Sequence, residues 1–437
     1  MSLRTLSLGL VAAAALAGPA PAAAEDEIFF PILVYRTGPY APSGIPWANG
    51  TVDGYKLVNA RGGIGGVKVV WEECETSYDT KAGVECYEKM KTAHGGAAVI
   101  NPWSTGISYA VIPKASGDKV PVQTLGYGRT DASDGRVFPW IFTAPTSYWS
   151  QTSAQVKYIA EQIGGMDKLK GKKITLVYHN SAYGKEPIPT LEALAKQHGY
   201  ELSLLAVDHP GQEQKATWLQ IRRQKPDWVL LWGWGVMNQV AIREATEIGF
   251  PMDHIIGSWW AGSDADVRPT AAQAKGYKSA SFHGAGGDYP ILKEIVAKVY
   301  SGNQQAAHAA NWGEVLYNRG IIQALVNTEA ARTAQQKFNV KVPNGEQMRW
   351  GFEHLNIDEK RLKELGADTF MRPIALSCAD HEGGGLVAFQ QWDGERWKVV
   401  SDWIQPMKEV VRPLIEASAA SYAKENNITP RDCSKEE

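Results

Sequence analysis

The chain has 437 residues, of which 44% are hydrophobic, and it carries a formal net charge of -2. This length exceeds one ordinary hydrophobic core and predicts two domains. The nearly balanced charge argues against nucleic acid or an anionic membrane surface as the partner, so we expect a small target.

The first 24 residues have the pattern of an export signal. Arg4 gives a basic start, an apolar stretch runs from Leu6 to Ala17, and small residues end at Ala24 before Glu25. The apolar stretch is too short to span a bilayer, which favours a cleaved signal peptide; a packed core helix is the alternative. We therefore expect cleavage near Ala24 and a mature protein in the periplasm.

The next hundred residues alternate strands and helices. Residues 28–36 form a continuous apolar run, typical of a strand buried on both faces. Further strands are predicted at 67–73, 97–103 and 120–128. Helices are predicted at 48–66, 80–96 and 105–119. Such alternation indicates crossover connections and a parallel sheet.

The same order recurs after residue 150, which predicts a second, similar lobe. Helices are predicted at 152–165, 186–199, 216–226 and 236–250. Strands are predicted at 172–180, 200–208, 227–235 and 254–260. No low-complexity linker separates the halves, so we expect a short hinge near residues 143–150. From Gly276 the pattern changes, with helices at 291–303 and 313–334 and a terminal hairpin at 383–403.

The four cysteines form an even set in a chain that we expect to be exported: Cys74, Cys86, Cys378 and Cys433. Disulfides are the default for such a set. Cys74 and Cys86 can close a short loop worth about 2–4 kcal/mol, and Cys378 with Cys433 then follows by elimination. A zinc site is the alternative, but no C-x2-C spacing or nearby histidine pair supports it, and we expect no metal.

Five motifs follow one another along the chain. They are VNARGGIGGVKVVWEE, VINPWSTGISYAVIPKASGDKVPV, FTAPTSYWSQ, LVYHNSAYGK and ADTFMRPIALSCADHEGGGLVAFQQWDG. Together they resemble the periplasmic solute-binding proteins of the leucine/isoleucine/valine class, which serve ABC importers. The resemblance implies the type I clamshell fold: α/β, with two Rossmann-like lobes with parallel sheets, joined by a three-crossover hinge.

The resemblance also implies a division of the chain. The N-terminal lobe would comprise 27–144 plus 277–372, and the C-terminal lobe 145–276 plus 373–405. Residues 406–437 would form a C-terminal extension.

Ligands of open parallel sheets bind beyond the carboxyl ends of the strands. Residues following five predicted strands are therefore candidates for the cleft: Trp103, Ser104, Thr105, Gly126, Tyr127, Gly128, Tyr183, Trp234, Trp259 and Trp260. The resemblance places a cradle for a ligand carboxylate on Ser104 or Thr105 and on the backbone of Gly126 and Gly128. Either hydroxyl can instead cap the helix that starts near Gly106.

Tyr183 matches the family's cleft tyrosine, which the second lobe presses onto the ligand as the hinge closes. Core packing is the alternative for this residue. In amino-acid-binding members, two acidic residues hold the ligand's ammonium group, and Tyr148 and Trp259 stand at those positions here. Losing two charged hydrogen bonds weakens a zwitterion by about 3–6 kcal/mol.

We therefore expect a flat or apolar ligand, such as an aromatic or aliphatic carboxylate, held between rings. A quaternary ammonium compound bound through cation–π contacts is one alternative. A branched-chain amino acid or amide is another.

No catalytic machinery is visible in the sequence. There is no G-x-S-x-G motif, HEGGG at 381–385 lacks a second histidine, and the glycines at 62–66 follow a helix rather than a strand. His308, Glu353 and His354 are interpreted as solvated helix residues rather than as metal ligands. We expect a monomeric binding protein, not an enzyme, without a cofactor, that delivers its ligand to ABC transporter permease subunits. A module that reports to a membrane receptor is the alternative.

Overall fold

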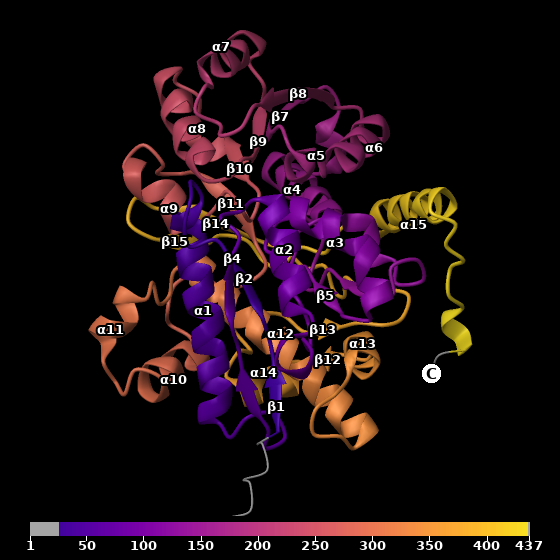
Figure 1. Ribbon diagram of the computed structural model, residues 1–437. Helices are drawn as coiled ribbons and strands as arrows, with labels where there is room; N and C mark the ends of the chain where they lie inside the picture. The colour runs from indigo at the N-terminus through magenta and orange to yellow at the C-terminus, as the bar shows by residue number, and fades with distance from the viewer. Residues whose placement is uncertain (1–25, 436–437) are drawn as a thin grey trace, which may run out of the picture.

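The computed structural model describes residues 26–435. The expected signal peptide lies outside this part of the chain, so its cleavage stays a prediction. The described residues form two α/β lobes, which lie one above the other in Figure 1. This confirms the fold class that the sequence predicts.

The upper lobe in Figure 1, here called the C-terminal lobe, contains a seven-stranded sheet in the order β15-β14-β11-β10-β9-β7-β8. Its strands are β7 (Lys173–His179), β8 (Glu201–Val207), β9 (Trp228–Trp232), β10 (Ile255–Gly257), β11 (Lys278–Ser281), β14 (Ala388–Trp392) and β15 (Trp397–Val399). Strands β7 to β11 are parallel, whereas β14 and β15 form the predicted antiparallel hairpin. The strands β7 and β9 are almost entirely buried, as their continuous apolar runs predict.

The helices of this lobe are α4 (Tyr148–Ile163), α5 (Ala182–Lys185), α6 (Ile188–His198), α7 (Lys215–Gln224), α8 (Val236–Glu247) and α9 (Asp264–Val267). Figure 1 shows α7 and α8 on one side of the sheet and α5 and α6 on the other. The side chains of Ser147 and Ser181 accept hydrogen bonds from the first turns of α4 and α5, which fixes where these helices begin. Gly199 ends α6 in the left-handed conformation that glycine favours.

The lower lobe, here called the N-terminal lobe, contains short strands. They are β1 (Glu27–Phe29), β2 (Ile32–Val34), β3 (Lys68–Val70), β4 (Glu73–Glu75), β5 (Val122–Gln123), β6 (Ile141–Phe142), β12 (Asn356–Ile357) and β13 (Ile374–Ala375). The predicted strand 28–36 is divided at Pro31, which has no N–H to donate to a ladder. The predicted strand 97–103 contributes only isolated bridges at Ile100 and Asn101.

The helices of the N-terminal lobe are α1 (Ala41–Ala60), α2 (Thr80–Met90), α3 (Thr105–Asp118), α10 (Pro290–Lys298), α11 (Gln304–Ala309), α12 (Val315–Phe338), α13 (Gly345–Glu353) and α14 (Glu359–Leu365). Helices α1 and α12 pack closely against each other. A Cβ atom at Gly50 would collide with the carbonyl oxygen of Tyr317, so glycine permits this approach of the two helices. Arg319, near the start of α12, contacts Trp259 and Trp260 of the C-terminal lobe, so this end of α12 lies at the interface between the lobes.

Three segments of the described chain connect the lobes: the one from β6 to α4, the one that follows β11, and the one from β13 to β14. Strand β11 pairs with β10 and β14 in the larger sheet. The expected second crossover at residue 276 therefore moves to the segment beyond Ser281. The remaining division of the chain between lobes stays a proposal.

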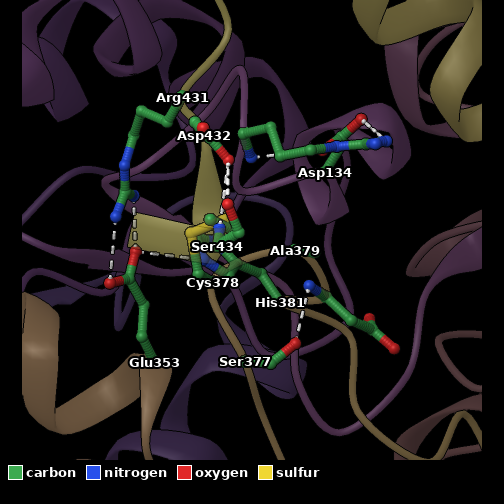
Figure 2. The surroundings of a disulfide bond; sticks show 12 residues. Asp134, Glu353, Ser377, Cys378, Ala379, His381, Arg431, Asp432 and Ser434 are labelled. Atoms are coloured by element: carbon green, nitrogen blue, oxygen red, sulfur yellow. Dashed lines mark hydrogen bonds and ion pairs between the residues drawn. A yellow bond between two sulfur atoms is a disulfide. The ribbon is translucent and has the colours of Figure 1, made fainter. Parts of the chain in front are cut away.

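Both predicted disulfides are present, Cys74–Cys86 and Cys378–Cys433. The second joins the C-terminal tail to the segment between β13 and β14. Figure 2 shows Arg431 beside this disulfide, and its Nη1 donates to Glu353 Oε1 at 2.6 Å. The tail is therefore tied to a lobe-connecting segment and to α13.

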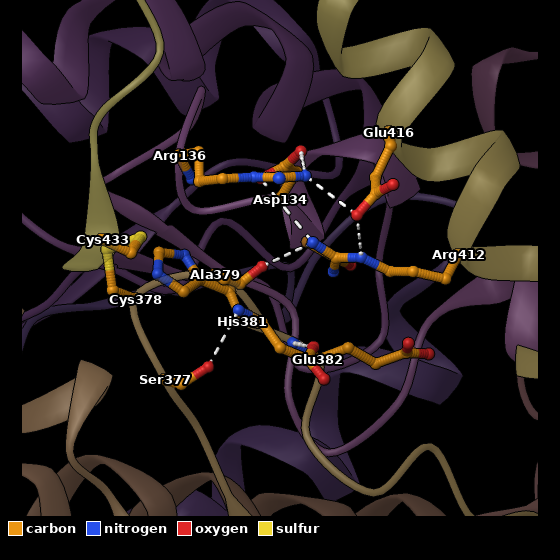
Figure 3. Close-up of polar contacts among 12 residues, drawn as sticks. Asp134, Arg136, Ser377, Cys378, Ala379, His381, Glu382, Arg412, Glu416 and Cys433 are labelled. Carbon is orange, nitrogen blue, oxygen red and sulfur yellow. Dashed lines mark hydrogen bonds and ion pairs between the residues drawn. A yellow bond between two sulfur atoms is a disulfide. The ribbon is translucent and has the colours of Figure 1, made fainter.

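Helix α15 (Lys408–Glu425), yellow in Figure 1, precedes this tail and packs on α4 and α6. Figure 3 shows Arg412 of α15 between Glu416 and the carbonyl oxygen of Ala379, to which its Nη2 donates at 2.7 Å. Arg136, which lies between β5 and β6 of the N-terminal lobe, donates through its Nη2 to Glu416 Oε1 at 2.9 Å. Here α15 and the tail together are called the strap, because they contact both lobes and the third connecting segment.

Across residues 26–435, every helix is too short or too polar to cross a membrane.

Candidate functional site

Aromatic side chains from both lobes meet between the lobes and are buried there. This group, called the aromatic cluster, comprises Tyr35, Trp47, Trp103, Tyr127, Tyr148, Tyr183, Trp234, Trp259, Trp260 and Phe282. Most of its members lie within four residues after a strand, and parallel strands bring their carboxyl ends to the same edge of a sheet. All seven aromatic residues that the sequence predicts for the cleft belong to it.

The rings of the two lobes are in direct contact. Tyr127 of the N-terminal lobe stacks on Trp260 of the C-terminal lobe, with ring centroids 4.2 Å apart. Trp47 stacks on the same indole at 4.9 Å, and Trp260 Nε1 donates to Tyr148 Oη at 2.7 Å. The lobes are therefore closed upon each other.

Ser104 and Thr105 lie at the start of α3, beside the cluster. Ser104 Oγ accepts a hydrogen bond from Ile107 N at 3.4 Å, so it caps the helix as the alternative interpretation expects. Thr105 Oγ1 lies 3.4 Å from Tyr148 Oη. Both residues also line a cavity of about 270 Å³, so capping does not remove them from the cleft.

This cavity lies between the lobes and has aromatic walls. Tyr40, Tyr78, Tyr183 and Trp234 line it, and Thr80 and Asn180 connect it with the surface. Its volume suits a small organic molecule.

Tyr183 is held rigidly at one wall of the cavity. Its Oη donates to Gly233 O at 3.0 Å and lies 2.6 Å from Ser258 Oγ, so the ends of β9 and β10 fix the phenol. Its ring centroid lies 5.5 Å from that of Tyr148. Tyr183 would therefore move as one body with the C-terminal lobe when the hinge closes. Its contact with a ligand stays a prediction.

The two glycines of the expected carboxylate cradle have different neighbours. Gly126 faces the indole of Trp259, whereas a Cβ at Gly128 would collide with the carboxyl of Glu186. Glu186 belongs to the C-terminal lobe and accepts hydrogen bonds from Tyr109 Oη and Thr130 Oγ1, both at 2.8 Å. Burial raises the pKa of Glu186 to about 7. A ligand carboxylate at Gly128 would therefore lie beside another acid.

The sequence interpretation missed Arg319, which lies wholly buried in α12 at the aromatic cluster. Its guanidinium stacks on Trp260 at 4.5 Å and on Phe282 at 4.7 Å, and its Nη1 donates to Trp259 O at 2.9 Å. A signal was available, because Arg319 is the one charged residue in the stretch from 315 to 328. Glu186 had no comparable signal.

Two histidines and a tyrosine meet at the edge of the cavity. Tyr40 Oη of the N-terminal lobe lies 2.6 Å from His209 Nδ1, which lies 3.4 Å from His179 Nε2. Burial and the nearby His209 lower the pKa of His179 to about 4. The contact therefore joins the lobes, and the imidazole of His179 in it is neutral at ordinary pH.

One interpretation from the sequence is wrong. Glu353 is buried rather than solvated, because it packs beneath the strap. Burial raises its pKa, but hydrogen bonds from His381 and Arg431 outweigh burial and lower the pKa to about 2. Within residues 26–435 there is no group of three histidine, cysteine or acidic side chains that could hold a metal ion.

Comparison with known proteins gives consistent results. A family model described as periplasmic binding protein matches residues 27–396. A crystal structure from the Pseudomonas fluorescens group, named as an ABC transporter permease, is 46% identical; the match covers 93% of this chain and 99% of that one, with a TM-score of 0.88.

Curated relatives are more distant. The Leu/Ile/Val-binding protein homolog 7 of Brucella suis is 25% identical over 60% of this chain and 65% of its own length, and so is matched over slightly less than two thirds. A solute-binding protein of Rhodopseudomonas palustris, crystallised with benzoate, is 16% identical, with coverage of 87% of this chain and 97% of that one and a TM-score of 0.66. It shows the same fold.

Proposed function

The chain belongs to the periplasmic binding protein family, and from that premise we propose that it is the extracytoplasmic solute-binding component of an ABC importer. It works in the periplasm as a monomer without catalysis and presents its ligand to the permease subunits. Hinge closure between the two lobes captures the ligand.

The ligand is a small organic molecule, an apolar or aromatic carboxylate. The observation that supports this class is the interlobe cavity, which is lined by Tyr40 and Tyr78 of the N-terminal lobe and by Tyr183 and Trp234 of the C-terminal lobe. The other rings of the aromatic cluster are buried beside it. Aromatic walls bind flat or apolar groups, and closure over them removes apolar surface from water. The solute-binding protein from Rhodopseudomonas palustris that was crystallised with benzoate has the same fold, so the fold accommodates such a ligand.

A branched-chain amino acid or amide is the second candidate, because curated relatives are named as Leu/Ile/Val-binding proteins. Against it, Tyr148 and Trp259 stand where two acids would hold an ammonium group. The carboxyl of Glu186 already accepts hydrogen bonds from Tyr109 and Thr130. A ligand ammonium group would have to displace both hydroxyls.

The test is to purify the protein under native conditions and identify the small molecules bound to it by mass spectrometry. Tryptophan-fluorescence titrations with leucine, benzoate, octanoate and a quaternary amine follow. We expect a carboxylate without an α-ammonium group to bind. Tight binding of leucine or valine would replace the first candidate by the second.

The genes that neighbour this one distinguish the two possible membrane partners. Genes for permeases and ATPases indicate an importer, whereas a gene for a receptor kinase indicates a sensory module.

A further inference from the structure

Buried hydrogen-bond donors without acceptors are concentrated in the aromatic cluster and on the helices beside it. Within residues 26–435, Asn318 Oδ1 and Asn327 Oδ1 of α12 are acceptors without a partner, and the following donors of this region also have none: Tyr35 Oη, Tyr127 Oη, Gln151 Nε2, Trp234 Nε1, Trp259 Nε1, Arg319 Nε and Gln323 Nε2. Each of these donors, from Tyr35 to Gln323, carries a hydrogen that it can donate. The hydroxyls of Tyr35 and Tyr127 interact with each other, which still leaves one of their two hydrogens without an acceptor. Buried donors are normally satisfied, so this group has hydrogens for which a ligand can supply the acceptor.

The orientation of the side-chain amides of Gln323 and Gln151 agrees with their NH₂ groups being without a partner. Gln323 Oε1 accepts from both Trp103 Nε1, at 2.6 Å, and Trp47 Nε1, at 3.1 Å. Gln151 Oε1 accepts from Trp259 N at 2.7 Å. Because the oxygens are engaged by N–H groups, the NH₂ groups are the ones left over.

Arg319 adds a positive charge to this set. Within residues 26–435 no carboxylate forms an ion pair with its guanidinium, and the buried carboxyl of Asp266 acts on it only at longer range. His283 offers only a neutral nitrogen at 3.5 Å from Nη2, because burial and Arg319 itself lower the pKa of His283 to about 3. A buried charge without a counter-charge is unfavourable unless a ligand supplies one.

Arg319 is also placed where hinge opening can uncover it. It belongs to α12 of the N-terminal lobe, whereas Trp259 and Trp260, which cover it, belong to the C-terminal lobe. Trp234, which lines the cavity, contacts Trp260 with ring centroids 5.6 Å apart. A ligand that enters the opened cleft therefore meets the guanidinium at its inner end.

We propose that the charged group of the ligand is a carboxylate that binds Arg319 and the hydroxyls of Tyr35 and Tyr127, with the apolar part of the ligand between the rings. This inference rests on the proposed function and goes beyond it by assigning the anion site to α12 instead of to Gly128, where Glu186 lies. A guanidinium and two phenols match the acceptor geometry of a carboxylate. The site excludes cations and disfavours neutral ligands.

The experiment compares ligands of one shape and different charge. The probes are benzoate, benzamide and phenyltrimethylammonium, together with octanoate and octanamide, titrated by calorimetry. The variants are Arg319→Gln, Arg319→Lys and Tyr127→Phe, and the matched control is Arg61→Gln, which removes an arginine that pairs with Glu294 at the far end of α1.

We expect a carboxylate to bind the wild type at least about 100-fold more tightly than its amide, since a charged hydrogen-bond set is lost. Arg319→Gln should abolish that preference, whereas Arg319→Lys should retain part of it. Tyr127→Phe should weaken binding of the carboxylate by about 10- to 100-fold. Arg61→Gln should bind as the wild type does. The unliganded melting temperature of Arg319→Gln should stay equal or rise, because an unpaired buried charge is removed.

Equal affinity of acid and amide, preferred binding of the cation, failure of both carboxylates to bind, or unchanged affinity in Arg319→Gln would each overturn the inference. A lower melting temperature of Arg319→Gln with equal losses for every probe would show a structural role and overturn it as well. If a neutral or cationic molecule co-purifies, this inference and the proposed ligand class fail, whereas the proposed role as a solute-binding component stands. If no solute of any charge binds, the proposed function fails too.

Discussion

Glu186 is a buried carboxyl that joins the lobes through Tyr109 and Thr130. Its folded-state pKa of about 7 is above its ordinary value of 4.5, because burial disfavours the charged form. The folded protein therefore binds a proton that the unfolded chain releases above pH 4.5. Its contribution to stability is full below that pH and is lost as the pH rises through 7.

We predict that Glu186→Gln changes stability in a pH-dependent way. The gain relative to the wild type should be small near pH 4.5 and reach about 1–3 kcal/mol at pH 8, because the amide has no proton to lose. Chemical denaturation across this pH range measures it. The control is Glu294→Gln, for which the sign is opposite, since Arg61 lowers the pKa of Glu294 to about 2. A pH-independent difference for Glu186→Gln would contradict the prediction.

The aromatic walls make a second prediction at this scale. Trp234→Ala and Tyr183→Ala should each weaken the identified ligand by about 1–3 kcal/mol, as truncation of a buried anchor does. Trp350→Ala is the matched control, because that indole stacks on His354 in α13, outside the aromatic cluster. Titration of the ligand found by mass spectrometry gives the result. If neither variant lost affinity, the ligand would bind elsewhere.

At the scale of elements, the sequence predicts the C-terminal lobe more accurately than the N-terminal lobe. Strands β7 and β9 are apolar runs buried on both faces, and such runs are visible without tertiary information, whereas β8 at the edge of the sheet is largely exposed. Helix α1 begins at Ala41, seven residues before its predicted start at 48, because Pro42 fits the first turn and Pro46 is tolerated inside. Burial of α1 against α12 outweighs the weak local signal.

The candidate site, too, could be predicted only in part from the sequence. The rule that ligands lie beyond strand ends finds the seven aromatic residues, because each follows a strand or begins a helix in the sequence. Arg319 and Glu186 lie on helical segments or beside them, and only the packing of α12 and the approach of the lobes bring them to the cleft. Charged residues at such positions are usually solvated, so the sequence pattern does not single out Glu186, whereas the uncharged neighbours of Arg319 do mark that residue as unusual.

The strap gives an element-scale prediction. The Cys378–Cys433 disulfide closes a longer loop than Cys74–Cys86, with sequence separations of 55 and 12. Replacing both Cys378 and Cys433 with serine should reduce the free energy of unfolding by about 4 kcal/mol, against about 3 kcal/mol for the shorter loop. It should also speed proteolysis within residues 426–435, which the disulfide and Arg431 hold in place. Unchanged proteolysis would show that α15 alone anchors the strap.

For the whole molecule, closure places two buried titratable groups between the lobes with opposite effects. In the closed state the pKa of His179 is about 4, against an ordinary 6.5, whereas that of Glu186 is about 7, against 4.5. Acidification between pH 6.5 and 4 therefore favours opening through His179, since the open state binds the extra proton. Acidification between pH 7 and 4.5 favours closure through Glu186, since the closed state binds it.

The pH ranges in which His179 and Glu186 act overlap, and their effects are opposite. The wild type should therefore show a weak pH dependence of ligand affinity, and a variant of either residue should reveal the effect of the other. In Glu186→Gln, affinity should fall about tenfold or more from pH 7 to pH 5, because only the histidine effect remains. In His179→Gln, affinity should rise over the same range. His209, Asp208 and Tyr40 face His179, and Asp131 acts on Glu186, so their fields are retained in both variants. Calorimetric titration of the identified ligand at each pH measures how affinity depends on pH in both variants. The same dependence in the two variants would mean that neither group changes its pKa on closure.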